Sequence, residues 1–248
     1  MAWRLTLDSV TEPDPSPPLG PRVGDVERLP LFPLGSVLFP GLLLPLHIFE
    51  ERYRQLVREL LARPEGAPKR FGVVAIREGR EVGPDGIRAL HEVGCAAELR
   101  AVEPYDDGRF DIVTTGSHRF RLQAIDTSLP YLQADVQWLP EPPGEAPAVL
   151  AKAVAARFAS YRRALAGLRE VPEPEDPSPI PEDPAVLSYL VSAAMVIDLA
   201  DRQALLASRD TTRRLRLALD LLRREEALLR HIPSLPGIQY ARQPFSPN

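Results

Sequence analysis

The chain has 248 residues, 44% of them apolar and 26% charged, which is enough for one large globular domain or two smaller ones. Its formal charge of −4 gives no overall attraction to nucleic acid or to an anionic membrane surface. The single cysteine, Cys95, excludes an internal disulfide framework, so we expect a reducing, cytoplasmic setting. Residues 1–27 are acidic, lack a continuous apolar core and do not fit a secretion signal; we expect this segment to be partly flexible.

Residues 29–49, LPLFPLGSVLFPGLLLPLHIF, carry no formal charge and have the length of a membrane span. Four prolines and two glycines interrupt the stretch, and each interior proline would remove a helix hydrogen bond that lipid cannot replace. We therefore predict no membrane helix. We expect extended segments over Leu29–Leu34, Val37–Phe39 and Leu42–Phe49, separated by turns at Pro33–Ser36 and Pro40–Gly41.

The hydrophobic period changes immediately after this stretch. Between Glu50 and Arg63, apolar residues recur at helical spacing, acidic residues occupy the first turn and an arginine the last. Pro64 and Gly66 follow and stop a helix. The sequence therefore predicts extended segments that lead into an amphipathic helix.

Five further runs over residues 70–139 are typical of β-strands. Turn signals separate them, among them Val82–Gly86 and Asp106–Gly108. The predicted strands are Arg70–Arg77, Ile87–Val102 with a bulge at Gly94, Arg109–Gly116, His118–Asp126 and Tyr131–Leu139. Their regular spacing favours a closed or nearly closed antiparallel sheet.

The composition shifts from Pro140 onward to a proline-rich linker followed by helical patterns. Val171–Pro184 contains six prolines and five acidic residues, which predicts a solvated connector. The predicted helices are Val149–Leu168, Ala185–Leu199, Asp201–Ala207 and Thr211–His231, the last with Asp210 as its N-cap. A proline-rich tail, Ile232–Asn248, ends the chain.

The order of these blocks resembles the amino-terminal substrate-binding domain of the Lon protease family. The resemblance is carried by LPLFPLGSVLFPGLLLPLHIFEERYRQLV (Leu29–Val57), FGVVAIR (Phe71–Arg77), VGCAAEL (Val93–Leu99), DGRFDIVTTGSHRFRL (Asp107–Leu122) and DRQALLASRDTTRRLRLALDLLRRE (Asp201–Glu225). It implies an α+β fold in which a PUA-like β pseudo-barrel precedes a C-terminal helical bundle. The implied divisions are an N-terminal segment 1–27, a barrel 28–140, a helical domain 146–231 with a connector at 170–184, and a tail 232–248.

Two modules of Lon proteases have no counterpart in the sequence. The motif G-x-x-x-x-G-K-[ST], which cradles nucleotide phosphates, is absent. Lys69 and Lys152 are the only lysines, and neither stands near a serine in a recognisable nucleophile context. The chain thus resembles a stand-alone Lon substrate-binding domain, and we expect no enzymatic activity, catalytic residues or cofactor.

Metal binding and cysteine chemistry have little support. His91 and Cys95 are four residues apart, but in a strand, and a zinc site needs three or four ligands. A lone cysteine between Gly94 and Ala96 is typical of a small core residue, although pairing with a distant histidine would make it a nucleophile. We predict neither a metal site nor a catalytic thiol; an enzyme with an unrecognised site stays an alternative.

A second alternative is RNA binding, because PUA-like folds often bind RNA. The candidate basic stripe consists of Arg119, Arg121, Arg213, Arg214 and Arg216. Acidic residues such as Asp210 and Asp220 flank the last three, so a solvated helix face with local ion pairs is favoured over a nucleic-acid partner.

The leading hypothesis is a non-catalytic module that recognises polypeptide segments or a protein partner in protein quality control. Leu42, Leu43 and Leu44 are consecutive, so they cannot all face one barrel interior. The alternative is that the outward residues pack beneath the helical domain. The candidate binding residues are Leu38, Phe39, Leu42, Leu43, Leu44 and His47. We make no prediction of the oligomeric state.

Overall fold

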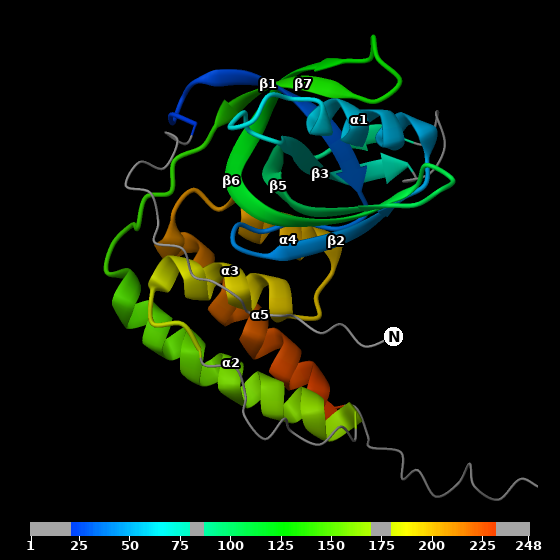
Figure 1. The fold of residues 1–248 in the computed structure, drawn as a ribbon. Coiled ribbons are helices and arrows are strands. Elements are labelled where there is room, and N and C mark those ends of the chain that lie inside the picture. Colours follow the sequence, from blue (N-terminus) through cyan, green and yellow to red (C-terminus); the bar gives the residue numbers. More distant parts are fainter. Residues whose placement is uncertain (1–20, 80–86, 170–179, 232–248) are drawn as a thin grey trace, which may run out of the picture.

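The computed structural model describes residues 21–79, 87–169 and 180–231, which fold into a β-rich part and a helical part (Figure 1). The strands are β1 (Val26–Leu34), β2 (Leu43–Ile48), β3 (Arg70–Gly79), β4 (Ile87–Leu90), β5 (Val93–Pro104), β6 (Phe110–Asp126) and β7 (Gln133–Trp138). The helices are α1 (Glu51–Leu61), α2 (Pro147–Arg169), α3 (Pro184–Ala194), α4 (Leu199–Ala207) and α5 (Thr211–His231). The α+β class predicted from the sequence is confirmed.

The β-part is a sheet that closes on itself. Its strand order is β1-β7-β6-β5-β3-β4, and β1 also pairs with β3, which joins the two sides of the sheet. This closing pair is parallel, whereas we expected an antiparallel sheet throughout. The difference arises because β2 and α1 lie between β1 and β3 in the chain and form the long crossover that a parallel pair requires.

The barrel interior is small and tightly filled. Phe120 lies among Leu29, Leu31, Val74, Ala96, Ala134, Val136 and Trp138. A Cβ at Gly72 would come within 2.7 Å of the Phe120 ring, and one at Gly94 within 2.5 Å. These two glycines therefore make room for the phenylalanine, which is why glycine interrupts two otherwise apolar strands.

The structure divides the strands differently from the prediction at two places. The predicted strand Ile87–Val102 is divided into β4 and β5 at residues 91–92. The predicted strands Arg109–Gly116 and His118–Asp126 form one continuous strand, β6, whose register with β5 shifts between Gly116 and Arg119. A Cβ at Gly116 would lie 2.2 Å from the Phe39 carbonyl oxygen, so this glycine lets another segment of the chain pass close to the strand.

The helices follow the predicted hydrophobic patterns, except that the predicted helix Ala185–Leu199 ends at Ala194 and the next helix, α4, already begins at Leu199. In α1 the residues at helical spacing, Tyr53, Leu56, Val57 and Leu60, are buried against the barrel. In α5 the amide of Arg213 donates to the Asp210 side chain over 2.7 Å, which confirms Asp210 as an N-cap. Helix α5 packs against α2 and α3, and α4 contacts β5. Together, α2–α5 form the lower part of the molecule in Figure 1.

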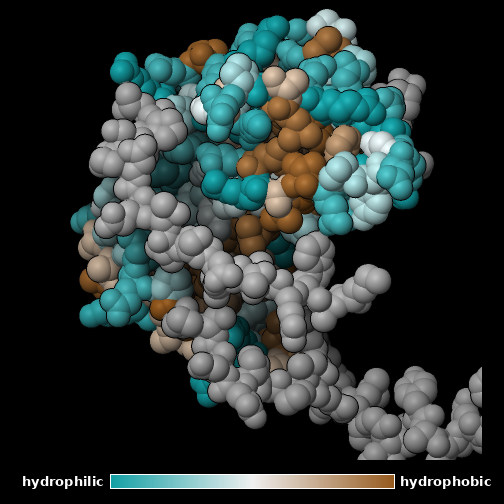
Figure 2. All heavy atoms as spheres, viewed as in Figure 1, coloured by the Kyte–Doolittle hydropathy of each residue, from teal (hydrophilic) through white to brown (hydrophobic). Residues whose placement is uncertain are grey.

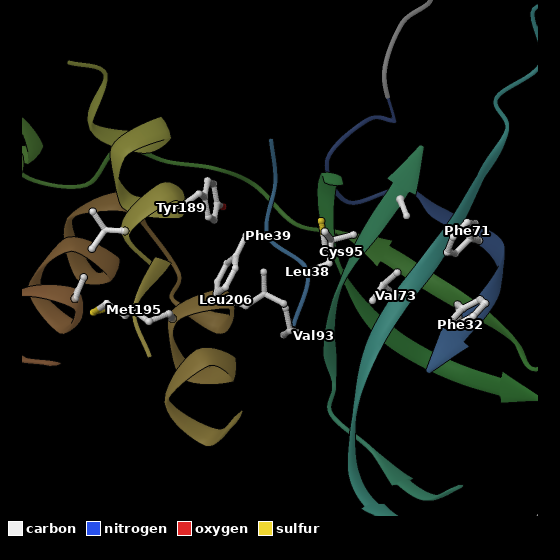
Figure 3. Packing of buried hydrophobic residues seen from close by; sticks show 14 of the residues in the cluster. Phe32, Leu38, Phe39, Phe71, Val73, Val93, Cys95, Tyr189, Met195 and Leu206 are labelled. Carbon is white, nitrogen blue, oxygen red and sulfur yellow. The ribbon is translucent and has the colours of Figure 1, made fainter. Parts of the chain in front are cut away.

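One hydrophobic cluster joins the barrel exterior to the helices. Leu38 and Phe39, in the segment between β1 and β2, lie between Val93 of β5 and the helical residues Tyr189 and Leu206 (Figure 3). Both side chains are buried, with exposed fractions of 6% and 1%. They therefore belong to the junction of the two parts and not to a free surface.

Four predictions fall wholly or partly outside the described residues. They concern the N-terminal segment up to residue 20, the loop Val82–Gly86, most of the connector 170–184 and the tail 232–248.

Candidate functional site

Strand β2 places apolar side chains at the surface of the barrel. It pairs with β6 on one side, and within the described residues no strand pairs with its other edge. Leu43, Pro45 and His47 are exposed, whereas the intervening leucines are half-buried and Ile48 is buried. This alternation is that of a strand with one face against a core and one face in solvent.

A pocket of 160 Å³ lies at the end of β2. Its walls come from three elements that follow one another in the chain: the end of β1, the end of β2 and the first turn of α1. The lining residues are Phe32, Pro33, Leu34, Leu46, His47, Ile48, Phe49, Glu50 and Tyr53. Phe32 stacks on Tyr53 with ring centroids 4.1 Å apart, which fixes one apolar wall. Figure 2 shows hydrophobic residues gathered on this side of the β-part, with hydrophilic residues around them.

A hydrogen-bonded polar group borders the pocket at His47. The His47 Nδ1 and the Tyr105 hydroxyl each lie 2.6 Å from one oxygen of the Asp111 carboxylate. The hydrogen bond from Tyr105, then that from His47, holds the pKa of Asp111 below its usual range, and the same carboxylate raises the pKa of Tyr105. Arg109 lies 3.3 Å from His47 Nε2. The group keeps His47 in place beside the exposed Phe49, whose ring centroid is 6.3 Å away.

Only part of the predicted polypeptide-binding set lies at this surface. Leu42, Leu43, Leu44 and His47 are on or next to β2 and are exposed or half-buried. Leu38 and Phe39 are excluded, because they fill the junction between the barrel and the helices. Three residues that the sequence did not indicate, Phe49, Tyr105 and Asp111, join the site. Tyr105 and Asp111 belong to the β5–β6 hairpin, whose turn was predictable at Asp106–Gly108, but whose register opposite β2 was not.

Two of the five arginines in the candidate basic stripe do not lie at the surface. Arg119 and Arg214 are buried, with exposed fractions of 1% and 0%. Both bind Glu141: Arg119 Nε contacts one carboxylate oxygen, and Arg214 Nη2 lies 3.2 Å from the other. Tyr189 donates to Glu141 over 2.6 Å and lies under the Arg214 guanidinium. These two buried arginines therefore link the barrel to the helices through Glu141.

All three side-chain nitrogens of Arg119 donate hydrogen bonds within the protein. Its Nη1 donates to the carbonyl oxygens of Leu206 and Ser208 over 2.7 and 2.6 Å, and its Nη2 donates to that of Pro140 over 3.0 Å. A guanidinium whose N–H groups are hydrogen-bonded to other groups of the protein is not available to bind a phosphate. Arg121, Arg213 and Arg216 remain exposed, the first on β6 and the other two on α5.

Cys95 is a core residue of β5. Its side chain is fully buried, and burial raises the pKa of the thiol far above its usual range, so a reactive thiolate is disfavoured. Within the described residues, no group of three or more His, Cys, Asp or Glu side chains could hold a metal ion. None of the helices in the described part of the chain is both long and apolar enough to cross a bilayer.

Comparison with known sequences gives the family. Residues 28–224 match the sequence model of the ATP-dependent protease La (LON) substrate-binding domain. The chain belongs to the Lon substrate-binding domain family. It is 30% identical over 194 residues to Lon protease 2 of Syntrophobacter fumaroxidans and 28% identical over 233 residues to Lon protease 2 of Sorangium cellulosum. These matches cover 77% and 91% of this chain, but only 23% and 27% of the relatives.

Solved structures show the same fold. A Lon N-terminal domain protein from Xanthomonas campestris superimposes with a TM-score of 0.52 at 23% identity, covering 84% of this chain and 99% of that one. The N-terminal domain of the Mycobacterium avium complex Lon protease gives a TM-score of 0.58 at 20% identity, covering 79% and 98%. The resemblance to the Lon family noted in the sequence is confirmed, and membership supports a substrate-binding role.

Proposed function

We propose that the chain is a non-catalytic module that binds apolar segments of polypeptides for protein quality control, and that the surface around β2 is its binding site. The observation that carries the proposal is the exposure of apolar side chains on β2 and at the pocket beside it. Leu43 and Phe49 are 68% and 52% exposed, although a continuous core is available on the other face of the strand. Exposed apolar groups clustered beside a pocket are typical of interaction sites.

The family supports the choice of ligand. Its described role is substrate binding in a protease whose substrates are polypeptides. The His47–Asp111 pair has an exposed imidazole, but none of the described residues that line the pocket is a serine or cysteine that could act as a nucleophile. Binding without turnover is therefore the function that this geometry favours.

A titration of the purified chain against one fluorescently labelled test protein, in unfolded and native forms, tests the proposal. We expect fluorescence anisotropy to rise with the unfolded form and to stay flat with the native one. Leu43→Ser should weaken binding about fivefold, which corresponds to roughly 1 kcal/mol. Equal, negligible binding to both forms would refute the proposed function.

Val149→Ser is the matched control. Val149 is 72% exposed, on α2 of the helical part, so the change removes a similar apolar group outside the β2 surface. We expect binding by this variant to equal that of the unchanged chain. If Val149→Ser weakens binding as much as Leu43→Ser, the binding surface is not the one around β2.

A further inference from the structure

We propose that the free edge of β2 binds its polypeptide by strand addition: an extended segment pairs with the backbone of residues 43–47 and places one apolar side chain in the adjoining pocket. This inference rests on the proposed function and gives the bound segment a conformation. Its basis is the hydrogen-bonding direction of each residue of β2, the proline within the strand, and the position of the pocket.

The direction of the backbone groups follows from Gly116 of β6. Its amide donates to the Leu42 carbonyl over 2.8 Å, and its carbonyl accepts from the Gly41 amide over 2.8 Å, so Gly116 faces β2. Alternate residues of a strand point to the same side, so Thr114 and Ile112 also face β2 and bond with their partners Leu44 and Leu46. The backbone groups of Leu43, Pro45 and His47 therefore point away from β6.

Pro45 agrees with this assignment and limits which polypeptides can pair with the free edge of β2. Pro45 has no N–H, and its backbone faces away from β6, so the pairing of β2 with β6 loses no hydrogen bond. The free edge then offers three carbonyl oxygens, from Leu43, Pro45 and His47, but only two amides. A second copy of β2 in the antiparallel register that uses all three residues would place Pro45 opposite Pro45, where neither chain donates. The edge is therefore suited to a different polypeptide, which supplies the missing N–H.

The pocket lies along this edge and not beneath one face of the strand. Three consecutive residues of β2, 46–48, line it, and consecutive residues of a strand point to opposite faces. Phe32 and Leu34 of β1 and Tyr53 of α1 also line it. A volume of 160 Å³ equals about five water molecules, the size of one large apolar side chain. An added strand would direct every second side chain toward it, so we expect a segment with alternating apolar residues.

N-methylated peptides test the backbone contact directly. The probe is an eight-residue peptide in which leucine alternates with threonine, compared with two versions that are N-methylated on alternate amides, at either the odd or the even positions. Strand addition uses one edge of the peptide, so we expect one methylated version to lose at least tenfold in affinity and the other to bind as the parent does. Equal binding by both versions, or an equal loss, would overturn strand addition.

Two variants at one residue provide the matched test on the protein side. His47→Ala removes the side chain and keeps the outward amide, whereas His47→Pro removes the amide, which β6 does not use. We expect His47→Pro to bind the parent peptide at least fivefold more weakly than His47→Ala. Equal affinities would show that the edge amide makes no bond to the ligand and would overturn the inference. If His47→Pro fails to fold, the methylated peptides still decide.

The outcomes separate this inference from the proposed function. If neither the unfolded test protein nor the parent peptide binds, the proposed function fails. If both bind but methylation has no edge preference, the function stands and strand addition is wrong. A dimer detected by sedimentation at the working concentration, which the parent peptide does not dissociate, would assign the β2 edge to a second copy and would also overturn the inference.

Discussion

The two apolar stretches on either side of Pro40–Gly41 have opposite surroundings. Residues 37–39 lead into the junction, where Phe39 is 1% exposed and its ring lies 6.3 Å from that of Tyr189 in α3. Residues 43–48 form β2, where every second side chain is exposed. Gly41 separates them with a φ of +79°, a left-handed conformation that favours glycine and lets the chain change direction.

This difference shows that apolar content alone does not define a core. Both stretches are rich in leucine or phenylalanine. The first is covered by α3 and α4, whereas in the second only every other side chain faces the core. The second has β6 on one side and, among the described residues, no strand on the other. The same composition therefore stabilises the fold at the junction and remains available for a ligand at β2.

The largest effect expected from this comparison is at Phe39. Phe39→Ala should lower the free energy of unfolding by about 4 kcal/mol, because it leaves a cavity in a fully packed site. The melting temperature should fall by roughly 10 °C for a chain of this size. Denaturant unfolding followed by circular dichroism measures the change. A loss below about 1 kcal/mol would mean that the barrel and the helices do not depend on this contact.

A substitution among the polar residues of the same junction should lower the free energy of unfolding nearly as much as Phe39→Ala. Glu141→Ala leaves the buried guanidinium groups of Arg119 and Arg214 without their carboxylate, at a cost of about 3 kcal/mol. Glu145→Ala removes an exposed carboxylate four residues away and should change stability by less than about 0.5 kcal/mol. Chemical denaturation of both variants measures the contrast. Equal effects would show that Glu141 does not tie the two parts together.

The fold was largely predictable because its signals are local. The amphipathic period of α1, the turn at Asp106–Gly108 and the cap at Asp210 each depend on a few neighbouring residues, and all three are found in the structure. The closing β1–β3 pair was not predicted, because pairing between strands separated by a helix leaves no local trace.

The site was predictable only in part, for the same reason. A consecutive apolar run such as LLL has no period, so which residues face solvent depends on what packs against them. Leu38 and Phe39 are covered by helices that lie about 150 residues later in the sequence, counting from Phe39 to Tyr189. Arg119 and Arg214 resemble solvated arginines in sequence, and only their meeting at Glu141 shows that they are internal.

At β2 the same comparison predicts a small change in stability. Leu43→Ala should alter the free energy of unfolding by less than about 0.5 kcal/mol, because the side chain is mostly in solvent. The measurement is the one used for Phe39→Ala, which makes the two variants a direct pair. A loss of 2 kcal/mol or more, by the scale of buried leucine truncations, would place Leu43 in the core and remove it from the proposed surface.

The smallest expected effect concerns pH at the polar group beside β2. Hydrogen bonds from Tyr105 and His47 lower the pKa of Asp111 in the folded chain, so the ionised form is favoured by folding. The resulting stability is present above the ordinary aspartate pKa of about 3.9 and is lost as pH falls through the lower, folded-state pKa. We therefore expect Asp111→Asn to melt slightly below the unchanged chain at pH 5 and at nearly the same temperature at pH 2.5. Because the carboxylate is exposed, solvent screening keeps the difference small. If the difference in melting temperature is the same at both pH values, the ionised Asp111 carboxylate does not hold His47 in place. The hydrogen-bonded polar group would then not fix the border of the β2 surface.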